Sequence, residues 1–110
     1  FVSIPYSLEM NDTIAYVVNK VEPRRYGQML KDNFDTLYAE GEQSGTIMCI
    51  PTHNYQVACP HRLKAFEEAL DYITSHPDVW ITTGREIADY YRQHYYDTAL
   101  ADIAAKQGAA

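Results

Sequence analysis

The feature that most constrains this chain is a short, mostly apolar run, Thr46–Ile50, that leads into a proline and is followed closely by His53. Segments with helical patterns flank the run on both sides. A continuous apolar run of this length between helices is typical of a β-strand buried on both faces. His53 would then follow the carboxyl end of that strand, where site residues gather in open α/β sheets and parallel barrels. The run alone leaves two interpretations of His53 open: a functional side chain, or a residue that only hydrogen-bonds within its loop.

Three segments have the apolar spacing of amphipathic helices. The first spans residues 23–40, starts with a proline suited to the first helical turn, and is followed by Gly41 at a position that suits a left-handed cap. The second starts at another proline and spans about residues 60–75, because the proline that follows disfavours helix in the residue before it. The third follows Thr83, which forms a Ser/Thr-x-x-Glu capping box with Glu86.

Three segments favour strands: residues 1–6, 46–51 and 79–82, while residues 14–21 fit either a short strand or a loop. The alternation of strand and helix predicts an α/β fold in which parallel strands alternate with helices. Three strands are too few to cover both faces and both edges of an open sheet. The chain therefore either pairs with a partner or forms the C-terminal part of a larger sheet or barrel, and we favour the second.

Composition limits the class of protein. The chain has 110 residues, 46% of them hydrophobic and 22% charged, which is typical of a single globular domain. The net charge of −6 and the lack of a basic run argue against nucleic-acid binding. No apolar stretch reaches the roughly 18 residues that cross a bilayer, so we expect no membrane partner. The chain starts with Phe1 and no visible leader, which suggests a piece of a longer polypeptide.

The two cysteines, Cys49 and Cys59, lie outside any Cys-x-x-Cys or Cys/His metal spacing. We expect both thiols to be free. Free thiols favour a reducing, cytoplasmic compartment, although the sequence does not otherwise indicate a location.

Four stretches, taken in order, resemble one known family: residues 4–12, 30–41, 46–53 and 70–88. The first is similar to a family pattern Pro-Tyr-x-Leu-Asp-x-Asn-Asp. Together they resemble the C-terminal part of polysaccharide deacetylase-type enzymes (carbohydrate esterase family 4). The most similar branch includes allantoinase-like proteins, cyclic imide hydrolases and certain bacterial peptidoglycan deacetylases. The resemblance covers residues 1–96, and residues 97–110 follow as an Ala-rich tail.

The resemblance implies a distorted (β/α) barrel, of which this chain would form the C-terminal β/α units, and hydrolysis of an amide C–N bond. It also implies a divalent metal, with zinc as the expected ion, held by one Asp and two His from early strands. The motifs that carry those ligands, Thr-Phe-Asp-Asp and His-x-x-x-His, do not occur in this sequence. We therefore expect no metal ligands in this stretch.

Three residues are candidates for the site. By resemblance, His53 matches the histidine that protonates the leaving amine, and imidazole groups ordinarily titrate near neutral pH. Glu9 and Asp12 fall where many members have an Asp-x-x-Asp-Trp arrangement that orients an arginine and lines the substrate cleft. The sequence departs from the family at Glu9, at Thr13 in place of Trp, and at Pro51 in place of Leu. An Asx-turn or helix-cap role for Asp12 stays open.

Two classes of function follow. The first is part of a metal-dependent amide or imide hydrolase, which would act on an N-acetylated glycan or a small cyclic amide or imide. The second is a noncatalytic interaction or oligomerisation module, since a partial barrel exposes apolar edges that favour a homo-oligomer. A complete small α/β domain with its own ligand site at His53 is a third interpretation.

Overall fold

The computed structural model describes residues 1–108 and divides the chain into two compact units, Pro5–Val79 and a second that joins Phe1–Ile4 to the chain from Trp80 on. Each unit is described by itself. The last two residues of the predicted Ala-rich tail lie outside the described residues.

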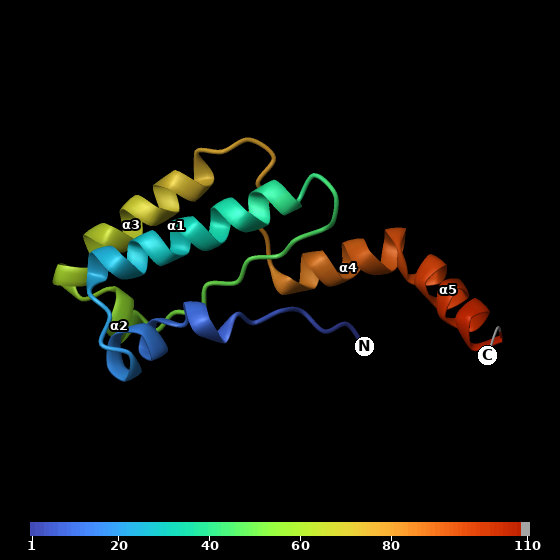
Figure 1. The fold of residues 1–110 in the computed structure, drawn as a ribbon, viewed down its shortest axis with the longest axis horizontal. Coiled ribbons are helices and arrows are strands. Elements are labelled where there is room, and N and C mark those ends of the chain that lie inside the picture. The colour runs from blue at the N-terminus through green and yellow to red at the C-terminus, as the bar shows by residue number, and fades with distance from the viewer. Residues whose placement is uncertain (109–110) are drawn as a thin grey trace. The chain divides into compact units, whose positions relative to one another are not determined.

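Two long helices form the body of the Pro5–Val79 unit. Helix α1 spans Pro23–Glu40 and helix α3 spans Pro60–Thr74, and they lie side by side (Figure 1). Both predicted helices are confirmed, each with proline in its first turn. The remaining elements of the unit are short: a 3₁₀ helix η1 (Leu8–Met10), a π-helix η2 (Ile14–Val18) and helix α2 (Asn54–Val57).

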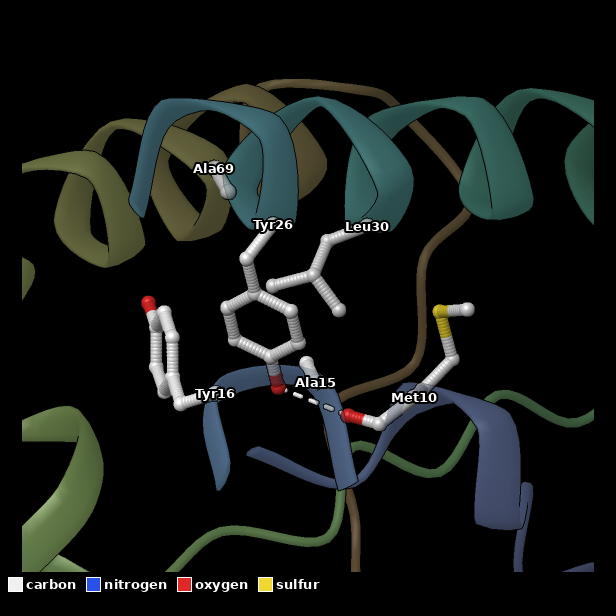
Figure 2. Close-up of a cluster of buried hydrophobic side chains, with 6 residues drawn as sticks. All are labelled: Met10, Ala15, Tyr16, Tyr26, Leu30 and Ala69. Carbon is white, nitrogen blue, oxygen red and sulfur yellow. Dashed lines mark hydrogen bonds between the residues drawn. The ribbon is translucent and has the colours of Figure 1, made fainter. Parts of the chain in front are cut away.

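The core of this unit lies between α1, α3 and the short N-terminal elements. Tyr26 and Leu30 project from α1 toward the short elements that carry Met10, Ala15 and Tyr16 (Figure 2). Tyr26, Leu30 and Ala69 have no exposed surface. Burying a side chain as large as leucine contributes about 1.5–3 kcal/mol to folding, so these residues are central to the stability of the unit.

The two helix backbones come close together at a glycine of α1. A Cβ atom built on Gly27 of α1 would lie 3.0 Å from the backbone oxygen of Ala65 in α3. Gly27 and Ala65 are both buried. Two small residues thus allow the helix backbones to meet, which a larger residue at position 27 would prevent.

The predicted strands do not form in residues 1–108: the segments 1–6, 46–51 and 79–82 are without regular secondary structure. A strand is defined by a ladder of hydrogen bonds to a neighbouring segment. Residues 46–51 receive a single such bond, from the Asp12 amide to the Pro51 carbonyl oxygen at 3.2 Å. The expected α/β pattern is therefore only partly met, because the described residues hold the helices but supply no partner for the extended segments.

The segment 46–51 is half-buried up to its closing proline, rather than buried on both faces. Met48 and Ile50, two residues apart, pack against the core cluster. In an extended chain, side chains two residues apart point to the same side. One side of the segment covers the core of the unit, and the opposite side has no such cover here.

Two further sequence predictions need revision. Gly41 does not adopt the left-handed conformation: its φ of −62° and ψ of −18° are right-handed, and its amide bonds to the Leu37 carbonyl. The left-handed positions fall instead on Ser7, Lys20 and Asp78. Residues 14–21, expected as a strand or a loop, contain the π-helix η2.

The second unit carries two helices, α4 (Gly84–His94) and α5 (Tyr96–Gly108). The capping box predicted at Thr83 is present, with its hydroxyl accepting from the Glu86 amide and the Glu86 carboxylate accepting from the Thr83 amide. The tyrosines at the C-terminal end of α4 are exposed: Tyr90, Tyr91 and the C-cap residue Tyr95 are 45%, 37% and 53% exposed. Within residues 1–108, no helix combines the length and the apolar character that crossing a bilayer requires.

Candidate functional site

The candidate site starts at the turn between η1 and η2. Asn11 closes this turn: its Oδ1 accepts from the amides of Thr13 and Ile14 at 2.8 and 3.3 Å. Its side-chain amide donates to the Tyr6 hydroxyl at 3.2 Å. Asparagine is suited to this role because its short side chain reaches the backbone two residues ahead. The turn thus fixes Asp12 with its carboxylate directed into the unit.

Asp12 is fully buried and holds His53 by two contacts. Its Oδ2 accepts from the His53 backbone amide at 2.7 Å, and its Oδ1 lies 2.8 Å from His53 Nδ1. The same Oδ1 accepts from the Thr13 amide at 2.7 Å. A buried carboxylate needs such donors, because leaving it unpaired costs several kcal/mol. All three of these donors are N–H groups of Thr13 and His53.

The imidazole of His53 is oriented by this carboxylate. An ionised carboxylate only accepts hydrogen bonds, so the proton on Nδ1 points to Asp12 and the second ring nitrogen, Nε2, is left for other partners. The His53 side chain is 37% exposed, so the ring is accessible while its anchor is buried. This is the arrangement of a proton donor or acceptor with a positioned ring.

Two aromatic residues lie near the Asp12–His53 pair, one exposed and one buried. The ring of Tyr55, which is 67% exposed, lies 5.4 Å from the His53 ring. Tyr26 is buried, and its hydroxyl donates to the Met10 carbonyl at 2.7 Å. Burial, with a smaller contribution from the Asp12 charge, raises the pKa of Tyr26 well above its ordinary value. Tyr26 therefore stays protonated and keeps the segment before Asp12 in place.

A charged side chain, that of Arg62, packs against the ring of Tyr16. The Arg62 guanidinium lies 4.2 Å from the centre of the Tyr16 ring and donates to the Gln56 side chain at 2.8 Å. Burial raises the pKa of Tyr16, and Arg62 opposes this effect. Arg62 thus joins α3 to both η2 and α2, next to the site.

The structure brings together two of the three predicted site residues. Asp12 and His53 meet, whereas Glu9 is exposed and makes no side-chain hydrogen bond or ion pair within residues 1–108. No group of three or more His, Cys, Asp or Glu side chains in this described part of the chain could hold a metal ion. Cys49 and Cys59 are free thiols, as expected.

Three neighbours of the pair were not identified from the sequence: Asn11, Tyr55 and the hydroxyl of Thr13, which lies 3.2 Å from His53 Nδ1. The sequence left an Asx-turn role open for Asp12, whereas in the structure the side chain of Asn11 closes the turn. Thr13 and Tyr55 carry no signal of their own, because their role depends on contacts made across the fold.

Comparison with known proteins finds similarity between this chain and solved structures. No protein-family model matches it, and no curated protein matches it significantly. Among solved structures, it is similar to a probable polysaccharide deacetylase from Pseudomonas aeruginosa PAO1 and to the Puue allantoinase. Both are 32% identical to it with a TM-score of 0.78, over 84% of this chain.

The chain spans 31% of the length of each of these two structures. Their names match the family and the branch that the sequence motifs indicated. The predicted resemblance is therefore confirmed: in sequence and in fold, this chain is similar to a portion of a polysaccharide deacetylase and of an allantoinase, as expected for the C-terminal part of a polysaccharide deacetylase-like protein.

Proposed function

We propose that this chain is the part of a metal-dependent hydrolase of non-peptide C–N bonds that supplies the general acid, His53. The observation that carries the proposal is the contact of 2.8 Å between His53 Nδ1 and the buried Asp12. The similarity to a deacetylase and an allantoinase supports the reaction class, because the names of both proteins denote enzymes that cleave amide C–N bonds.

In the proposed reaction, water adds to the carbonyl carbon of the substrate and the C–N bond then breaks. The leaving nitrogen needs a proton, which His53 Nε2 would donate. Asp12 keeps Nδ1 hydrogen-bonded, so the ring presents Nε2 to the leaving nitrogen. The products are a carboxylate and an amine. Of the two protons that the water loses, one restores the proton that His53 gave up and the other is released to solvent. Proton transfer of this kind contributes roughly 10²–10⁴-fold to the rate.

The metal expected for this family does not fit the described residues of this chain, which contain no suitable group of ligands. We propose that a divalent ion, with zinc as the first candidate, is held by segments of the full-length protein outside this chain. The role assigned to His53 and Asp12 needs no ligand from this stretch. In the same way, the extended segments such as 46–51 would find their strand partners in the rest of a β/α barrel.

The substrate is either an N-acetylated glycan or a small cyclic amide or imide. The two similar structures differ in this respect, one being a polysaccharide deacetylase and the other an allantoinase. Assays of the full-length protein for acetate release from an acetylated chitooligosaccharide and for opening of a hydantoin-type ring decide between them. A protein active in neither assay, with its metal content verified, would contradict the hydrolase proposal.

The test of the mechanism is His53→Gln in the full-length protein. We expect turnover to fall at least about 100-fold, in line with the loss of a general acid, with the unfolding midpoint little changed. His61→Gln is the matched control, because His61 is an exposed residue in the first turn of α3 and lies outside the pair. Full activity of His53→Gln would remove His53 from the mechanism.

A second candidate function, a noncatalytic oligomerisation module, is favoured by one observation in the unit that carries α4 and α5. Trp80, Ile81, Tyr95 and Ile103 are all more than half exposed. Exposed apolar side chains that form a contiguous patch mark interaction surfaces, and in this candidate function these four would contribute to one. Light scattering with size-exclusion chromatography tests this candidate: a concentration-independent oligomer supports it, and a monomer at high concentration contradicts it.

A further inference from the structure

We infer that Thr13 is a positioning residue for His53, in addition to Asp12. The inference rests on the proposed role of His53 as the proton donor. The observation behind it is that Thr13 contacts both members of the pair. Its hydroxyl oxygen lies 3.2 Å from His53 Nδ1, and its backbone amide donates to Asp12 Oδ1 at 2.7 Å.

The geometry around Nδ1 assigns the role of each acceptor. Nδ1 carries a single proton, and the closer acceptor is Asp12 Oδ1 at 2.8 Å. The Thr13 hydroxyl, at 3.2 Å, is then a second and weaker acceptor of the same proton. Two acceptors that converge on Nδ1 restrict rotation of the imidazole ring more than one does, because His χ2 on its own is a broad torsion.

Thr13 is also well placed to be rigid. Its backbone amide is shared by Asn11 Oδ1 at 2.8 Å and Asp12 Oδ1 at 2.7 Å, so its main chain is fixed on two sides. Threonine is β-branched and has few accessible χ1 rotamers. The hydroxyl is thus held beside the His53 ring by the same turn that places the carboxylate.

The consequence concerns turnover rather than binding. Without the hydroxyl, the ring keeps its bond to Asp12 but gains freedom to swing, which moves Nε2 away from the leaving nitrogen. Small displacements of a catalytic group reduce the rate without a matching effect on affinity. Loss of one weak hydrogen bond corresponds to a change of about 2–10-fold.

The test compares Thr13→Val, which removes the hydroxyl and keeps the branched shape, with Thr13→Ser, which keeps the hydroxyl. In the 110-residue chain, NMR of the His53 ring should show faster exchange of the Nδ1-bound proton with water in Thr13→Val, by about 2–10-fold. Thr13→Ser should restore slow exchange. Thr52→Val is the control, because Thr52 is exposed and its hydroxyl makes no hydrogen bond within residues 1–108.

In the full-length protein, Thr13→Val should lower kcat by about 2–10-fold with KM nearly unchanged, and Thr13→Ser should recover it. Unchanged exchange of the Nδ1 proton in Thr13→Val overturns the inference. A loss in Thr13→Ser as large as that in Thr13→Val also overturns it, since the methyl group would then be the important part. The NMR measurement is independent of turnover, so it tests Thr13 even if His53→Gln shows that the proposed function is wrong.

Discussion

The Nδ1 atom of His53 lies 2.8 Å from a carboxylate oxygen of Asp12, a residue 41 positions earlier in the chain. Asp12 has no exposed surface, whereas the His53 side chain is 37% exposed. The pair therefore joins a buried anchor to an accessible ring, and it links the turn after η1 to the extended segment that ends before α2.

Replacing Asp12 with alanine should destabilise the Pro5–Val79 unit. The His53 amide would lose its acceptor, and the Thr13 amide and the His53 ring would each lose one of two acceptors. A buried donor left unpaired costs about 1–3 kcal/mol. We expect the free energy of unfolding, measured by urea denaturation, to fall by at least about 2 kcal/mol. Asp71→Ala, at an exposed position in α3, should change it by less than about 0.5 kcal/mol. Equal effects of the two variants would contradict the anchoring role of Asp12.

The two buried tyrosines of the core should respond differently to loss of their hydroxyl groups. Tyr26 donates to the Met10 carbonyl at 2.7 Å, so Tyr26→Phe leaves a buried acceptor unpaired and should cost about 1–3 kcal/mol. The Tyr16 hydroxyl is buried without a hydrogen-bond partner within residues 1–108. Tyr16→Phe should therefore be neutral or stabilising. Thermal unfolding of the two variants side by side checks the prediction, and the reverse order of stability would refute it.

Gly27→Ala should destabilise the unit although alanine favours helix by about 1 kcal/mol. The new Cβ would lie 3.0 Å from the Ala65 oxygen, a backbone atom that cannot move without shifting α3. We expect a lower unfolding midpoint in urea and broadened or shifted NMR signals around Ala65. Gly45→Ala is the control, since a Cβ there would have no neighbour within 4 Å. A Gly27→Ala variant more stable than the parent chain would show that the helices do not meet at this point.

The capping box of α4 should make this helix sensitive to acid. The hydroxyl of Thr82 and the amide of Thr83 donate to the Glu86 carboxylate and lower its pKa. Because the folded pKa is lowered, ionised Glu86 stabilises α4 at any pH above its ordinary value. That stabilisation is lost as the pH falls through the lowered folded value. Protection of the Thr83 amide from hydrogen exchange should decline over this range.

Thr82→Val tests which hydrogen bond lowers the pKa of Glu86 most. It removes the Thr82 hydroxyl, which is the largest cause of the lowered pKa. The pKa of Glu86, followed by NMR of its carboxyl carbon, should therefore rise toward the ordinary value. Thr98→Val, in α5, removes a hydroxyl outside the capping box and should leave the titration in place. No difference between the two variants would mean that the Thr82 hydroxyl does not bond Glu86 in solution.

Local signals in the sequence determined where the three predicted helices begin. Proline in the first turn placed the starts of α1 and α3, and the Thr83–Glu86 capping box placed the start of α4. These signals act between residues three or four positions apart, so they do not depend on the rest of the fold. The motifs also indicated the family, and they singled out Asp12 and His53 one by one.

The tertiary structure decided which residues far apart in the sequence come into contact. It brings Asp12 to His53 and adds Asn11, Thr13 and Tyr55 around them, while Glu9 stays at the surface. It also decided that the segment 46–51 remains extended without becoming a strand. The physical reason is the same in both cases: side-chain contacts and strand ladders need a partner from a distant part of the chain, and no local pattern shows whether that partner is present.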